Sequence, residues 1–222
     1  MATQLNLPAG ATGRDRLSHL AAALAAVALL GTSAVALAAA VAPTLHSRYL
    51  PWITGRSLGI ASYGALAGLV ALGLVARHPW RHRLGLHPES LLRAHAVLGT
   101  TTLALVVAHV VALAGDRYAG VGWLGAVVPG LSHYRTGAVA LGVVALALLL
   151  AITATARLAG RLGARHWRSF HHLAGPLFVL VWLHGVLAGT DTAALRALYV
   201  TSAAVLAALA ASRLVARLPE PT

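Results

Sequence analysis

The chain has 222 residues, of which 59% are hydrophobic and 10% are charged, and its mean hydropathy is +0.78. This composition excludes a soluble globular domain and indicates an integral membrane protein. The net charge of +12 does not indicate nucleic-acid binding, because the arginines lie in short loops rather than along one recognition helix. The chain has no cysteine, which excludes disulfides and iron–sulfur ligation.

Six apolar stretches are long enough to cross a bilayer as helices, which takes about 20 residues each. They cover roughly residues 18–43, 57–76, 91–115, 136–156, 170–189 and 193–212. We therefore expect an all-α, polytopic bundle of six transmembrane helices, because a helix satisfies its own backbone hydrogen bonds inside the lipid. This domain would occupy residues 17–216, between a short N-terminal segment at 1–16 and a tail at 217–222.

The distribution of arginine predicts the orientation of these spans. Twelve of the 17 arginines fall in the N-terminal segment, the second and fourth loops and the C-terminal tail, and five fall on the other side. By the positive-inside rule, both termini are cytoplasmic. We expect a multi-pass protein of the plasma membrane, in a bacterium the inner membrane, whose arginine clusters contact anionic lipid.

The third and fifth spans each carry two histidines inside the membrane. His95 and His171 lie near the predicted cytoplasmic ends, and His109 and His184 follow fourteen and thirteen residues later. At a rise of about 1.5 Å per residue, each later histidine lies about 20 Å further out. The two spans run in the same direction, so the equal offsets predict two facing pairs. Ionisable side chains at this depth are costly and usually functional.

Helical phase supports this pairing on one span only. Fourteen residues at about 100° each return His109 to within roughly 40° of His95, but thirteen residues leave His184 about 140° from His171. Pro176 lies between the last two, and a proline inside a helix removes a backbone hydrogen bond and bends it. We expect a distorted turn at Pro176 to restore the phase.

Two facing imidazoles can hold one flat macrocycle, and they saturate both axial positions of a haem iron. Such an iron suits electron transfer more than oxygen binding. Without cysteine the haem would be non-covalent, so the sequence predicts two haems b. Haem propionates need cationic partners near each surface. The candidates are Arg93, Arg165 and Arg168 on the inner side, and Arg135 with His133 on the outer side.

A transition-metal permeation path is the competing interpretation, because imidazole also binds Zn, Cu, Fe and Ni. Metal transporters usually add buried carboxylates or sulfur to their histidines. The five acidic residues of this chain all fall at helix ends or in loops, which disfavours transport.

The histidine segments also carry a family resemblance. The segment RAHAVLGTTTLALVVAH holds the first two histidines, and LGARHWRSFHHLAGPLFVLVWLHG holds the other pair. Together they resemble the ferric reductase-like transmembrane domain over about residues 57–212. That superfamily includes ferric reductases, NADPH oxidases and the haem-bearing membrane subunit of the periplasmic methionine sulfoxide reductase system.

The resemblance implies a set of ligands. His95 and His171 would bind an inner haem, and His109 and His184 an outer one, with His171 rather than His172 as the ligand of the His-His dipeptide. The sulfoxide reductase subunit lacks a histidine that matches His95, so the two-haem, oxidase-like interpretation is preferred over a single-haem subunit.

The larger relatives continue into FAD- and NADPH-binding domains, which we do not expect here. The sequence therefore predicts the electron-transfer haem subunit of an oxidoreductase, and leaves open whether the chain is an enzyme by itself. Its electrons would come from a separate flavoprotein reductase or from quinol. They would pass to an extracytoplasmic acceptor such as ferric iron, a flavoprotein or a sulfoxide reductase.

Overall fold

The computed structural model describes residues 49–80 and 87–216, so the predicted span at 18–43 lies outside the described residues. The chain divides into two units, residues 1–50 and 51–222, and the second holds the helical bundle. Every regular element in the described residues is helical, as the composition predicts.

Five candidate membrane spans are present in the described residues, and they correspond to the last five of the predicted spans. They are α2 (Leu50–Ala76), α3 (Pro88–Gly115), α5 (Thr136–Arg157), α7 (Ala164–His171) followed by α8 (Ala174–Ala188), and α9 (Arg196–Val215). Two short helices, α4 (Gly122–Val127) and α6 (Ala159–Leu162), lie between them.

Helix α2 begins earlier than predicted, at Leu50 instead of residue 57. Arg56, counted as a loop residue in the sequence, is therefore inside a membrane helix. Its guanidinium pairs with the Asp191 carboxylate between α8 and α9, and its Cζ lies 5.4 Å from the centroid of the Trp52 ring. These partners explain why a charged residue is tolerated there.

The span that carries His171 and His184 is interrupted, but the predicted position of the interruption is wrong. Helix α7 ends at His171 and α8 begins at Ala174, so the break precedes Pro176. At the break, backbone hydrogen bonds join residues three apart instead of four, as when Leu173 N donates to Phe170 O at 3.0 Å. Pro176 lies in the first turn of α8, where its missing N–H breaks no helical bond.

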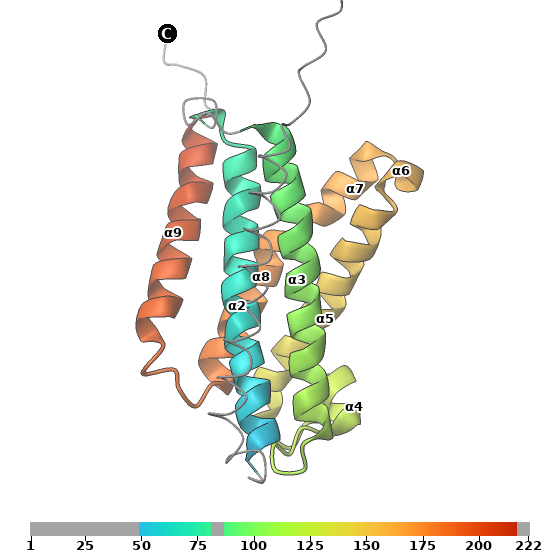
Figure 1. Ribbon diagram of the computed structural model, residues 1–222, viewed down its shortest axis with the longest axis vertical. Coiled ribbons are helices and arrows are strands. Elements are labelled where there is room, and N and C mark those ends of the chain that lie inside the picture. Colours follow the sequence, from blue (N-terminus) through green and yellow to red (C-terminus); the bar gives the residue numbers. More distant parts are fainter. Residues whose placement is uncertain (1–48, 81–86, 217–222) are drawn as a thin grey trace, which may run out of the picture. The chain divides into compact units, whose positions relative to one another are not determined.

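Helix α2 lies between α3 and α9, with α5 and α8 packed behind them (Figure 1). One apolar core joins α2, α3, α5 and α8 around Leu66, Leu149 and Leu177. A second joins α2, α8 and α9, in which the Tyr63 ring lies 5.0 Å from the Tyr199 ring. Of the helices in the first core, α3 and α8 carry His95, His109 and His184, and α2 and α5 contact these rings.

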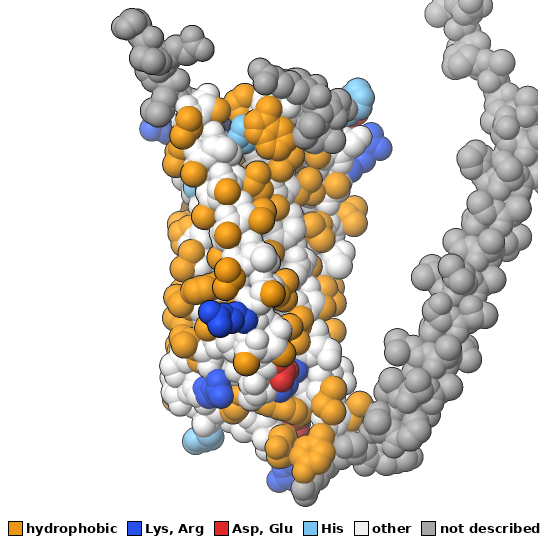
Figure 2. All heavy atoms as spheres, turned by 90° about the vertical axis from the view of Figure 1, so that its left-hand side faces the viewer, with side chains coloured by type: hydrophobic (Ala, Val, Ile, Leu, Met, Phe, Trp, Pro, Cys, Tyr) orange, Lys and Arg blue, Asp and Glu red, His pale blue; other side chains and the backbone are white. Residues whose placement is uncertain are grey.

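The outside of the bundle is largely apolar. Leu92, Val97 and Val200 are among the exposed hydrophobic residues, at 69%, 68% and 56% exposure. Figure 2 shows this pattern on the α9 side, where charged side chains gather in the lower half and at the upper rim. A soluble protein rarely exposes so much continuous apolar surface, whereas lipid requires it.

The segment between α3 and α5 closes one end of the bundle. Its helix α4 packs with the ends of α3 and α5 around Ala114, Val121 and Val139. The Trp52 ring meets the Tyr118 and Tyr134 rings edge-on, at 6.0 and 5.4 Å. This end therefore carries the aromatic residues that the sequence places at a membrane boundary.

Candidate functional site

The structure brings the four membrane histidines together in the two predicted pairs. His109 on α3 and His184 on α8 have ring centroids 6.4 Å apart, with the rings at 77° to one another. His95 on α3 and His171 at the end of α7 have ring centroids 5.8 Å apart, at 60°. Because of the break between α7 and α8, His171 and His184 both face helix α3.

Backbone carbonyls fix the chemical form of the His109–His184 pair. The Nδ1 atom of His109 lies 2.6 Å from Gly55 O, and that of His184 lies 2.7 Å from Ala138 O. A carbonyl oxygen only accepts, so each Nδ1 must carry the proton and donate it. In a neutral imidazole the Nε2 lone pair is then free, which is the form that binds a metal.

Glycines let neighbouring helices approach these rings. A Cβ atom added at Gly59 on α2 would lie 2.8 Å from Cε1 of His109. One added at Gly142 on α5 would lie 2.7 Å from Cε1 of His184. No real side chain tolerates such contacts, so both positions require glycine. The contact at the other pair is looser, because a Cβ at Gly73 would lie 3.3 Å from Cε1 of His95.

A cavity of about 180 Å³ adjoins the His109–His184 pair and is lined by α2, α3, α5, α8 and α9. Most of its wall is apolar, including Leu66, Val143 and Val181. Its polar groups include the two imidazoles, the Arg56–Asp191 ion pair and the hydroxyls of Tyr63 and Tyr199. An apolar cavity with a few convergent polar groups is the usual form of a cofactor or ligand site.

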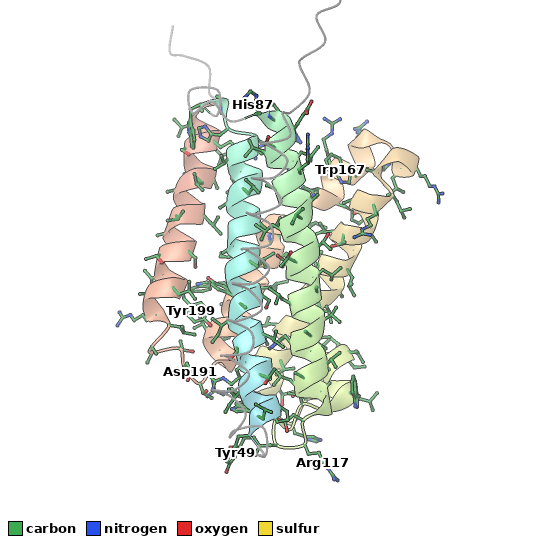
Figure 3. The ribbon with its side chains drawn as sticks, viewed as in Figure 1. Tyr49, His87, Arg117, Trp167, Asp191 and Tyr199 are labelled. Carbon is green, nitrogen blue, oxygen red and sulfur yellow. The ribbon has the colours of Figure 1, made fainter. Side chains whose placement is uncertain are left out.

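No sequence pattern identifies Tyr63, Tyr199 or Arg56 as residues of the site. The Tyr63 hydroxyl is hydrogen-bonded to Ser202 Oγ at 2.5 Å, and Figure 3 shows Tyr199 on α9 at the side of α2. The one signal in the sequence is that Arg56 lies among apolar residues, but the orientation prediction treats it as a loop charge. The glycines could not be selected from 22 in the chain without tertiary contacts.

The His95–His171 pair is less constrained. Its two Nδ1 atoms are buried and have no hydrogen-bond partner among the described residues. The Trp167 ring lies 5.4 Å from the His171 ring at an angle of 31°. Stacking and the end of α7, rather than hydrogen bonds from the backbone, therefore hold His171.

The predicted propionate partners have different surroundings. Arg93 forms an ion pair with Glu89 at 3.6 Å, and both side chains are more than 80% exposed. Arg168 is exposed on α7, beside Trp167. Arg165, His166 and His172 are also exposed there, and His133 is exposed next to Tyr134.

Arg135 has a structural role that was not predicted. Its NH1 group donates to Leu187 O at 2.7 Å and to Gly189 O at 3.2 Å, while the Tyr134 hydroxyl donates to Ala188 O at 2.8 Å. These carbonyls belong to the end of α8, where no helical donor is available. We call Tyr134 and Arg135 the α8 clamp. It fixes the helix end one turn beyond His184.

The competing metal-path interpretation lacks a ligand cluster. Within residues 49–80 and 87–216, no group of three or more histidine, aspartate or glutamate side chains is placed to hold a metal ion. Two facing imidazoles leave most of the coordination sphere of a bare ion to other ligands.

Comparison with known protein families matches residues 58–182 to the family described as the ferric reductase like transmembrane component. The matched region includes His95, His109 and His171 and ends two residues before His184. Neither a curated protein nor a solved structure matches the chain. Because the matched region covers more than half of the chain, and the fold and membrane spans agree with it, the protein belongs to the ferric reductase-like transmembrane family.

Proposed function

We propose that the protein is a di-haem b-type membrane cytochrome that passes electrons across the membrane. The observation that carries this proposal is the presence of two facing histidine pairs at different levels of the same helices. Transmembrane domains of this family generally bind haem and act in membrane electron transfer. A haem supplies one-electron redox chemistry, and two imidazole ligands leave its iron no open position.

The residues present fit a haem at the His109–His184 pair. Both Nε2 lone pairs are available, because both Nδ1 protons are donated to carbonyls. The glycines of α2 and α5 leave room for the rings, and an apolar cavity adjoins them. At the His95–His171 pair, the unpartnered buried nitrogens fit a site that is completed by a ligand.

The arrangement of α3 separates the two sites along the membrane normal. The helix is continuous from Pro88 to Gly115, so the fourteen residues from His95 to His109 span about 21 Å. Two redox sites at these levels of one continuous helix would form a path between the two surfaces. The His95–His171 pair adjoins the arginine-rich segment 157–168, which the positive-inside rule places in the cytoplasm.

This orientation supports a direction of electron flow from the cytoplasm outward. We propose that a separate flavoprotein reductase or quinol reduces the cytoplasmic haem at His95 and His171. The outer haem at His109 and His184 would then reduce an extracytoplasmic acceptor such as ferric iron. The protein would lie in the plasma membrane with both termini in the cytoplasm.

A single-haem cytochrome of the methionine sulfoxide reductase type is the second candidate. It is favoured by the difference between the pairs, since backbone carbonyls orient only the His109–His184 imidazoles. In that case His95 and His171 would be membrane histidines without haem.

The decisive experiment is a reduced-minus-oxidised absorption spectrum of the detergent-purified protein, with pyridine haemochrome quantification. We expect two haems b per chain with low-spin bands. H184A should lose one haem and H171A the other, while H172A, a neighbouring exposed histidine, should keep both. Two full haems in H184A or H171A would refute the pairing, and one haem in the unaltered protein would support the second candidate.

A further inference from the structure

Three buried ring nitrogens without partners gather at the His95–His171 end of the bundle. They are Nδ1 of His95, Nδ1 of His171 and Nε1 of Trp167, and none has a hydrogen-bond partner in the described part of the chain. Trp167 precedes His171 by one helical turn, and their rings are packed 5.4 Å apart. Figure 3 shows Trp167 on α7, towards the end of the bundle that carries His87.

Elsewhere in the bundle, comparable buried ring nitrogens are satisfied. Trp182 Nε1 donates to Tyr199 O at 3.1 Å, and the imidazoles of the other pair donate to carbonyls. A buried donor without a partner is costly in lipid as in a protein core. The concentration of three such atoms around one pair therefore indicates a missing polar ligand rather than local mispacking.

The donor chemistry defines the class of that ligand. An indole N–H can only donate, so its partner must be an acceptor. A carboxylate is such an acceptor, and a charge-assisted hydrogen bond is stronger than a neutral one.

We propose that Trp167 is a positioning residue that donates its Nε1–H to a propionate carboxylate of the haem held by His95 and His171. Its indole also stacks on the His171 ring and so orients the ligand. This inference rests on the proposed function, because it requires a haem at this pair. It assigns the carboxylate to an indole that lay outside the arginine set predicted from the sequence.

The test compares W167F with W182F, a matched control whose indole already has a backbone partner. Phenylalanine keeps an aromatic ring against His171 but removes the N–H. Haem release to excess apomyoglobin and a potentiometric titration are measured on the purified holoprotein. In W167F, one haem should leave roughly tenfold faster, the loss expected for one hydrogen bond to a charged group, and its midpoint potential should shift. The second haem and W182F should behave as the unaltered protein.

The outcomes distinguish a failure of the role of Trp167 from a failure of the proposed di-haem function. Two haems in the unaltered protein, with identical release and potentials in W167F, would overturn the role of Trp167 and leave the proposed function intact. Absence of haem from the His95–His171 pair in the unaltered protein would instead refute the di-haem function.

If W167F does not fold, a second measurement on the unaltered protein tests the proposal. Ultraviolet resonance Raman spectra of the unaltered protein, with and without haem, should show one indole N–H gaining a hydrogen bond on haem binding. No change in the indole band would overturn the proposal.

Discussion

The two histidine pairs differ in what holds them. At His109–His184, backbone carbonyls orient both imidazoles, and glycines on α2 and α5 bring the neighbouring helices within contact. At His95–His171, both Nδ1 atoms lack partners within the described residues, and one ring follows a helix break. The first pair is organised by the protein before any ligand binds. The second has no hydrogen bond from the described residues to orient its Nδ1 atoms.

The largest expected effect comes from closing the glycine contacts of the His109–His184 pair. In G142A the new Cβ would lie 2.7 Å from Cε1 of His184, so the ring must move and lose its bond to Ala138 O. We expect this pair to lose its haem, while the other haem stays. Haemochrome quantification measures the loss. G64A, with no atom within 4 Å of the new Cβ, is the control, and normal haem content in G142A would contradict the packing argument.

The α8 clamp should give the next largest effect. R135A removes two hydrogen bonds to the end of α8, which is expected to cost about 2 kcal/mol. Arg135 also has a left-handed backbone, with φ of 37°, so R135G should recover about 1 kcal/mol of that loss. The midpoint of thermal Soret loss in detergent reports both. Equal stability of R135A and the unaltered protein would show that the clamp is dispensable.

A smaller effect is expected from the corresponding glycine substitution at the His95–His171 pair. In G73A the nearest contact would be 3.3 Å, to Cε1 of His95, a ring with no hydrogen bond to lose in the described structure. We expect both haems to remain and only one midpoint potential to move slightly. Complete loss of that haem in G73A would mean that the His95–His171 pair is as tightly constrained as the other.

The smallest effect is expected at the Arg56–Asp191 ion pair beside the cavity. The Asp191 side chain is 50% exposed, and exposed ion pairs contribute at most about 1 kcal/mol. D191N should therefore lower the thermal midpoint only slightly, and added salt should reduce the difference. A large loss of stability in D191N would show that the ion pair is shielded from solvent.

The sequence alone predicts the features that depend on the length of apolar stretches and on the depth of a residue in the membrane. Five predicted spans and both histidine pairs are present, because membrane helices have uniform rise and their apolar length is set by the bilayer. It was insufficient where tertiary contacts decide. The break at 172–173 lies before Pro176, which occupies a harmless first-turn position, and no local pattern marks it.

The roles of Arg56 and Arg135 illustrate the same limit. Both were counted as loop charges, and Arg135 was expected to meet a propionate. The partner of Arg56, Asp191, is 135 residues away in the chain, and the carbonyls that Arg135 binds are 52 and 54 residues away. No local pattern identifies such partners, although an arginine flanked by apolar residues is a reason to look for one.

The carbonyl bonds of His109 and His184 have a thermodynamic consequence for the two haems that we propose. Donating Nδ1–H to an oxygen makes each imidazole more electron-rich, and an electron-rich axial ligand stabilises ferric over ferrous iron. A haem at this pair should therefore be the harder of the two to reduce. Electrons arriving at the other haem would then face an energetic step, which a strongly reducing donor or a fast extracytoplasmic acceptor must overcome.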